Sequence, residues 1–447
     1  MLVVTSNWCV SDASLSAGPS RGVLDRFRRE LRRASCRAGM QADGRYRPVS
    51  AIAVVFAGDT FDWLTSREWT GTVRPWETGL RAARARERVA AASLRRARRL
   101  LATLAAWGRR GVEVPLADGR GRPLAGKGRR VPVAVAVLRG DRDRWIDAVL
   151  PAGSAVAAVV STGATWTDGG VLVRHGEEIE YLWHDAEREP TLGESLAVDL
   201  IARFGALLHE VADVRPRVAA IMHDLVTGRM LDARSRLQAW LTAHGRDGTL
   251  SAAAIRSVGE AWQRAVDAWY RAAWRLDLGQ GHGMDLLGLL AADLARRESD
   301  AADHGEPPRQ SFSAPGLGGG RDAEGVTCEI LGHPPVGFIP ATKWRCGIEC
   351  LGPACLARPT GREGPRAARG RAGLALLDPP GMIFRGAVGD ESPVPAAAIV
   401  GRGPMGIRLD WLPIGGGAVP GPCDASPHGI VWHSLPADQE ARIVDAA

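Results

Sequence analysis

The sequence contains a series of short apolar runs, each followed directly by a polar fragment. The runs at 51–57, 131–138, 171–173 and 326–331 are rich in Val, Ile and Ala, and a further apolar run covers residues 2–10. Runs of this length and composition are typical of strands buried on both faces rather than of helices. The pattern therefore predicts an α/β fold built on these strands.

Other segments have apolar residues every three to four positions, which is the pattern of amphipathic helices. Helices are predicted over 22–35 and over 80–107, and Gly108 and Gly111 end the second. From about 192 to 299 the pattern is wholly helical, with helices predicted at 193–211, 216–229, 231–243, 251–275 and 284–297. Since this block interrupts an otherwise alternating chain, we predict that it is an inserted all-helical cap.

The same patterns divide the chain into four parts. Residues 1–191 and 325–447 are predicted to form the two halves of one core, separated by the cap at 192–299 and a Gly- and Pro-rich flexible loop at 300–324. The finer predictions are a strand at 155–160, a basic loop at 115–130, antiparallel strands of a second sheet at 372–377, 396–400, 405–413 and 429–432, and an irregular segment at 352–370.

Composition adds three expectations. No apolar stretch among the 447 residues is long enough to span a bilayer, and the start lacks a basic signal region, so the chain is expected to be soluble and cytoplasmic. Seven cysteines argue against a disulfide framework, and Cys346, Cys350 and Cys355 lack the paired spacing of a zinc site. The net charge of +7 comes from arginines interleaved with Ala and Leu, which favours solvated helix faces and no specific nucleic-acid partner.

The polar fragments after the apolar runs carry the candidate chemistry. A carboxylate or an imidazole follows each run closely, at Asp12, Asp59, Asp141, His175 and His333. Because the carboxyl ends of strands in an open α/β sheet meet at the edge where ligands bind, these groups are expected to converge. Oxygen and imidazole ligands without thiolate suit Mn, Fe or Zn. The sequence therefore predicts a metal site at that edge.

The order of these fragments resembles that of the calcineurin-like metallophosphoesterases. The best matches are FAGDTFDW at 56–63 and VRHGEE at 173–178, and the resemblance covers residues 1 to about 185 and 325 to the end. The most similar type is the bacterial UDP-diacylglucosamine hydrolase, which also carries a helical cap. The resemblance implies a four-layer α/β/β/α sandwich with an inserted helical cap, and metal-dependent hydrolysis of phosphoesters.

Carried over residue by residue, the resemblance assigns ligands to two metal ions. Asp59 would bridge both ions, and Asp141, His175 and His333 would complete the first site. Asp12 belongs to the second site, where the family has two further histidines. Here those two positions are Ser14 and Pro335, which are a weak ligand and a residue without a side-chain donor. One firmly bound divalent ion is therefore expected.

The motif around Asp141 departs from the family at one more position. Arg142 stands where the family has a histidine, and an arginine can bind phosphate but cannot donate a proton at neutral pH. We predict Arg142 and Asp143 as the catalytic residues of this motif.

Two functions follow from these residues. The first is a metallophosphoesterase that acts on a phosphorylated small-molecule or lipid-linked substrate. The alternative is a catalytically impaired pseudo-phosphoesterase that serves as a ligand- or protein-binding scaffold. A nuclease or nucleic-acid module has only the net charge in its favour.

Overall fold

The computed structural model describes most of the first 276 residues and part of the remainder. The described ranges are 1–6, 8–16, 21–41, 43–149, 160–168, 171–176, 190–227 and 233–276, and the backbone of seven strands between residues 328 and 413.

Four parallel strands form one side of the first sheet. They are β1 (Leu2–Thr5), β2 (Ile52–Phe56), β5 (Val133–Leu138) and β6 (Val160–Gly163), paired in that order. On the other side of β1, the antiparallel strand β14 (Val394–Gly403) pairs in turn with β15 (Gly406–Pro413) and β13 (Met382–Ile383). The apolar runs at 2–10, 51–57 and 131–138 thus contain strands, as predicted.

The second sheet follows directly from the first. Its order is β10 (Ile348–Leu351), β11 (Ala354–Ala357), β12 (Gly373–Leu376), β9 (Cys328–Leu331), β8 (Val171–Arg174) and β7 (Thr165–Asp168). Strand β9 is parallel to both of its neighbours, and the other pairs are antiparallel. Only Ala164 separates β6 from β7, so the chain passes at once from an edge of one sheet to an edge of the other.

Several sequence predictions about strands were wrong. The segments 396–400 and 405–413 belong to the first sheet, not the second, because β14 pairs with β1. Strand β11 lies within the segment 352–370 that was expected to be irregular. The predicted loop at 115–130 is largely a hairpin of β3 (Val112–Ala117) and β4 (Pro123–Val131).

The turn chemistry explains this hairpin. The Asp118 carboxylate accepts hydrogen bonds from the backbone N–H groups of Arg120 and Arg122, both at 2.8 Å, and Gly121 has a φ of +74°. Asp and Gly at these positions are the usual means of reversing a chain tightly. The glycines and basic residues of β4 hide the alternation that would have revealed a strand. The predictions for 284–297, 300–324 and 429–432, and for nearly all of 155–160, lie outside the described residues.

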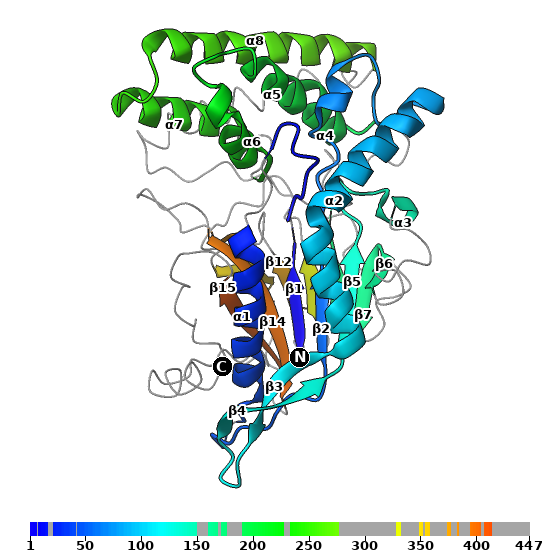
Figure 1. Cartoon of the computed structure of the whole chain (residues 1–447), viewed down its shortest axis with the longest axis vertical. Helices are drawn as coiled ribbons and strands as arrows, with labels where there is room; N and C mark the ends of the chain where they lie inside the picture. Colours follow the sequence, from blue (N-terminus) through cyan, green and yellow to red (C-terminus); the bar gives the residue numbers. More distant parts are fainter. Residues whose placement is uncertain are drawn as a thin grey trace, which may run out of the picture.

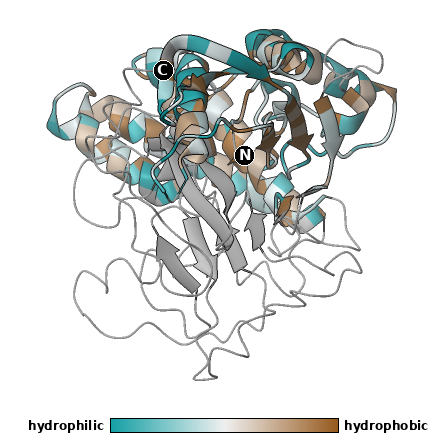
Figure 2. Ribbon diagram, turned by 90° about the horizontal axis from the view of Figure 1, so that it is seen from below, coloured by the Kyte–Doolittle hydropathy of each residue, from teal (hydrophilic) through white to brown (hydrophobic). Residues whose placement is uncertain are grey.

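Two long helices run along the first sheet, α1 (Arg21–Gly39) and α2 (Leu80–Arg110) (Figure 1). They bury aromatic and aliphatic side chains against it: Phe27 of α1 makes edge contacts with Phe56 of β2 and Trp107 of α2, at 6.3 and 5.8 Å between ring centroids. Figure 2 shows that the helices carry both hydrophilic and hydrophobic residues, as amphipathic helices do. Two short helices, η1 (Arg67–Thr70) and α3 (Ile146–Val149), follow β2 and β5.

A helical layer lies beyond the carboxyl ends of β1 and β2 (Figure 1). It consists of α4 (Leu192–Ser195), η3 (Leu196–Ala202), α5 (Arg203–Leu208), η4 (Arg215–Arg217), α6 (Val218–Thr227), α7 (Ala233–Arg246) and α8 (Ala252–Arg275). In sequence it separates β8 from β9, which pair in the second sheet. None of the helices within the described residues is long and apolar enough to cross a membrane.

Two ion pairs fix this layer to the loops that follow the strands. Arg74, after η1, donates from Nε to Asp199 Oδ1 of η3 at 2.7 Å. Arg144, after β5, lies with Nη1 2.9 Å from Glu194 Oε1 of α4. Glu194 and Asp199 are almost fully buried, so each needs its cation. The helical layer is therefore held directly beside the loops at the strand ends.

Candidate metal centre

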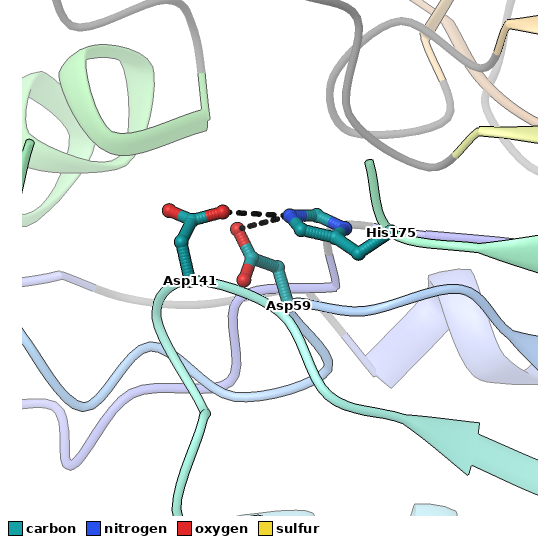
Figure 3. A group of neighbouring side chains, drawn as sticks. All are labelled: Asp59, Asp141 and His175. Carbon is teal, nitrogen blue, oxygen red and sulfur yellow. Dashed lines mark hydrogen bonds and ion pairs between the residues drawn. The ribbon is translucent and has the colours of Figure 1, made fainter. Parts of the chain in front are cut away.

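Three of the predicted ligands come together in the structure. Asp59, Asp141 and His175 follow β2, β5 and β8, and each offers a donor atom within 4.8 Å of the others (Figure 3). Their exposed fractions are 1%, 5% and 1%. Two sheets thus contribute to one buried cluster of two carboxylates and one imidazole, which could hold a metal ion.

The backbone around Asp59 is shaped to bring it there. Gly58 has a φ of +85° and Asp59 a φ of +51°, so two successive residues have left-handed conformations. This conformation is uncommon for residues other than glycine, although Asp and Asn tolerate it best. Backbone hydrogen bonds hold the turn, since Cys9 N donates to Asp59 O at 2.9 Å and Arg142 N donates to Asp59 Oδ1 at 3.0 Å.

Two glycines leave room for the ligands. A Cβ atom on Gly58 would lie 2.2 Å from His175 Nδ1, and one on Gly140 would lie 2.3 Å from Asp59 Oδ1. Both distances are far inside van der Waals contact. The Gly-Asp pairs in the sequence therefore reflect close packing of the two loops against the ligand side chains.

The orientation of His175 is that of a metal-binding histidine. Its Nδ1 lies 2.8 Å from the carbonyl oxygen of Ala57, so Nδ1 carries the proton and donates it. Nε2 then faces two carboxylates, 2.6 Å from Asp141 Oδ1 and 3.6 Å from Asp59 Oδ2. A neutral imidazole would direct a lone pair at these oxygens, which is unfavourable unless a proton or a metal ion lies between them. Backbone support of the second ring nitrogen is common among metal-ligating histidines.

The electrostatics of the cluster are also suited to a cation. Burial, together with the neighbouring Asp141 carboxylate, raises the pKa of Asp59 to about 8. Burial likewise raises the pKa of Asp143 to about 7. Carboxyl groups with such pKa values resist ionisation at neutral pH, and a bound cation would restore the ionised form.

Arg142 provides a fixed cation beside the cluster. Arg142 is 5% exposed, with Nε 3.4 Å from Asp59 Oδ2 and Nη1 3.8 Å from Asp62 Oδ2. Although burial lowers the pKa of Arg142, the carboxylates of Asp62 and Asp59 and the Cys9 thiol raise it overall, so the group stays charged. Among the described residues, Nη1 has no hydrogen-bond partner.

Asp143 ties two loops together. It is fully buried, its Oδ1 accepts from Gly140 N at 2.8 Å, and its Oδ2 accepts from Phe61 N at 3.0 Å. Both oxygens therefore bind backbone groups on the loops that follow β2 and β5. These hydrogen bonds fix the loop of Asp59 relative to the loop of Asp141. Asp143 itself lies outside the donor cluster in the structure.

Asp12 does not join the cluster either. Its Oδ1 accepts from Ser14 N at 2.8 Å and Ser14 Oγ at 2.7 Å, and its Oδ2 accepts from Ser66 Oγ at 2.5 Å. Ser66 is the N-cap of η1. The serine that stands where the resemblance implies a histidine thus holds the carboxylate predicted to bind the second metal.

The remaining predicted positions are His333, Pro335 and Cys346, which lie outside the described residues. Strand β9 ends at Leu331, which pairs with Arg174 of β8. The chain therefore leaves β9 at the same edge that carries His175. Cys350 and Cys355 are partners in the pairing of β10 with β11.

The sequence did not reveal the roles of Ala57 and Ser66. Every residue has a backbone carbonyl, so the residue type at position 57 does not show that its carbonyl binds His175. Ser66 has only the general signal of an N-cap serine before η1. Asp62 follows Asp59 at a spacing that suggests capping, and in the structure its Oδ1 accepts from Thr65 N at 3.2 Å.

No protein-family model, curated protein or solved structure matches this chain. A function for the site is therefore argued from the residues of the site alone.

Proposed function

We propose that the chain is a metal-dependent phosphoester hydrolase with one well-formed metal position, built from Asp59, Asp141 and His175. The observation that carries this proposal is the orientation of His175, with Nδ1 bound to the Ala57 carbonyl and Nε2 directed at two carboxylates. The donor set suits Mn, Fe or Zn. When bound, such an ion would polarise a phosphoryl oxygen and lower the pKa of a bound water.

Arg142 is proposed to hold the phosphate. It lies against Asp59, stays charged, and keeps Nη1 without a hydrogen-bond partner among the described residues. A guanidinium in this position can bind a phosphoryl oxygen and stabilise charge that develops in the transition state. It cannot protonate a leaving group, so that proton must come from water or from the substrate.

The proposed fold is the four-layer sandwich that the sequence resemblance implies. Two sheets that share an edge crossing at Ala164, and helices α1 and α2 along the first sheet, support it. In this fold His333 would be the fourth ligand, because β9 ends beside β8. The helical layer would act as the cap.

The cap is proposed to contribute to the substrate pocket. Arg144 joins α4 to the loop that carries Asp141. On the same loop, Trp145 stacks on Trp63, with ring centroids 6.3 Å apart, and Trp63 stacks on Phe61 at 5.3 Å. Phe61 and Trp63 are buried and Trp145 is partly exposed, so Trp145 is the ring of this stack that could contact the apolar or ring-containing part of a phosphorylated small molecule or lipid-linked substrate.

The alternative is a pseudo-phosphoesterase that binds a ligand or protein without turnover. The observation in its favour is that Ser14 and Ser66 donate hydrogen bonds to the two carboxylate oxygens of Asp12. A second metal ion there would have to break these bonds. The two proposals agree on metal binding and differ on hydrolysis.

The experiment combines metal analysis with a phosphatase panel. The purified chain would be loaded with Mn, Fe or Zn and assayed on p-nitrophenyl phosphate and bis(p-nitrophenyl) phosphate, with Asp59→Asn as the matched control. Metal-dependent turnover that the control lacks supports the hydrolase. One bound ion with turnover equal to the control supports the scaffold. Absence of metal binding contradicts both.

A further inference from the structure

A second candidate binding site lies between α1, α2 and the β3–β4 hairpin. A groove of about 720 Å³ runs between the middle of α1 and the end of α2. Five arginines line it: Arg28, Arg29, Arg32, Arg110 and Arg130. This groove sits near Val112 and Arg130, before the amino end of β5, whereas Asp141 follows the carboxyl end of β5. It is thus separate from the metal centre.

The positive charge of this groove is not balanced. Its lining includes two carboxylates. Asp25 lies 3.9 Å from Arg28, and Glu113 lies 3.5 Å from Arg32, with all four side chains about half exposed. Exposed pairs of this kind are weak and exchange readily with other ligands.

The other three arginines have no carboxylate partner within the part of the chain that is described. Arg29 and Arg110 are exposed and make no ion pair there. Arg130 donates to the carbonyl oxygens of Arg110 and Gly111, at 3.3 and 3.4 Å, which places its guanidinium at the end of α2. A concave surface with three guanidinium groups that have no carboxylate partner attracts a polyanion.

The surrounding surface extends this charge. Helices α1 and α2 carry seventeen arginines and three carboxylates, whereas the whole chain has 57 basic and 50 acidic residues. The β3–β4 hairpin lies at the end of the molecule away from the helical layer (Figure 1) and adds exposed basic residues, Arg120, Arg122, Lys127 and Arg129. Helices α1 and α2 and the β3–β4 hairpin therefore carry a large excess of basic over acidic residues.

We propose that this groove binds the sugar–phosphate backbone of nucleic acid without regard to sequence. Guanidinium groups match phosphate oxygens in shape and charge. The groove lining contains no Asn or Gln that could read base edges. A membrane surface fits less well, because the large exposed hydrophobic residues among those described are Leu80 and Tyr270, and neither lines the groove.

The test measures binding of fluorescein-labelled 20-nucleotide single-stranded and duplex DNA by anisotropy, over a range of NaCl concentrations. The groove variant is Arg29→Glu/Arg110→Glu. The matched control is Arg95→Glu/Arg98→Glu, which makes the same charge change at exposed positions of α2 outside the groove. Thermal melts of all variants confirm that they remain folded.

The proposal expects wild-type binding that weakens with salt, a loss of at least about tenfold in the groove variant, and less than about threefold in the control. The log–log salt slope of the groove variant should be shallower by about 2, for two lost phosphate contacts. Equal losses in both variants would show that binding follows net charge, and would overturn the proposal. So would absence of binding at 50 mM salt, or tighter binding to phosphatidylserine vesicles than to DNA.

The proposed DNA binding does not involve the metal centre. Asp59→Asn should leave DNA binding unchanged, and loss of binding in that variant would assign the anion site to the metal centre instead. Because the groove and the cluster share no residue, failure of the hydrolase proposal leaves this one standing.

Discussion

Replacing Asp59 with asparagine should stabilise the metal-free chain at pH 8 while it abolishes metal binding. Asparagine has nearly the same shape as aspartate and tolerates the left-handed conformation that residue 59 adopts, with a φ of +51°. Its amide oxygen can still accept the hydrogen bond from Arg142 N that Asp59 Oδ1 accepts at 3.0 Å. The main change is the loss of a buried ionisable group.

The magnitude follows from the raised pKa of Asp59. Burial and the Asp141 carboxylate move the pKa from 3.8 to about 8 in the folded chain. Since the folded pKa lies above the unfolded one, the folded state binds more protons, and stability falls as the pH rises from about 4 to about 8. At about 1.4 kcal/mol per pH unit, the loss at pH 8 is on the order of 5 kcal/mol. The asparagine variant does not suffer this loss.

The assay is thermal unfolding of both proteins at pH 5 and pH 8, in chelator and with excess Mn. In chelator, the variant should unfold at a higher temperature than the wild type at pH 8, and the difference should shrink at pH 5. With Mn at 100 times Kd, the wild type should gain about 2.7 kcal/mol and the variant nothing. If the variant in chelator is less stable than the wild type by the same amount at both pH values, Asp59 is a stabilising partner of Arg142 and the reasoning fails.

Four further results are expected. Gly58→Ala should weaken Mn binding by at least about tenfold in a calorimetric titration, because the added Cβ would lie 2.2 Å from His175 Nδ1; unchanged affinity would contradict the packing. Asp143→Ala should lower the free energy of unfolding by about 2–4 kcal/mol in urea, because two buried N–H groups lose their acceptor; a change below about 1 kcal/mol would show that water replaces it. Asp12→Asn should leave the Mn stoichiometry at one, whereas a loss of the ion would place Asp12 among its ligands. Mn affinity should rise between pH 6 and pH 8 as Asp59, with its pKa of about 8, loses its proton, and a flat profile would argue against it as a ligand.

The cluster could be predicted from the sequence because its signal is local. Asp59, Asp141 and His175 each follow an apolar run after no more than three residues, and the ends of β2 and β5 are neighbours in one parallel sheet. The same reasoning does not predict the position of the Asp12 carboxylate. Strand β1 ends at Thr5, so a loop separates it from Asp12, and the hydrogen bonds of Ser14 and Ser66 then decide where that carboxylate points.

Other features depend on contacts that the sequence pattern does not contain. The pairing of β14 with β1 joins Val3 to Ile399 across almost the whole chain, and no local periodicity specifies that partner. The hairpin of β3 and β4 was missed because its second strand, PLAGKGRRV, is largely exposed and contains glycine and proline, which are depleted in strands. The arginines of the groove come from α1, α2 and β4, so their grouping appears only after folding.

Titration of the metal-free chain with Mn(II), followed by calorimetry and checked by metal analysis after dialysis, tests the central claim most directly. The claim predicts saturable binding of one ion per chain, lost in Asp59→Asn and in Asp141→Asn and retained in Asp12→Asn. Binding that is absent, or that persists unchanged in both cluster variants, would show that Asp59, Asp141 and His175 do not form a metal centre.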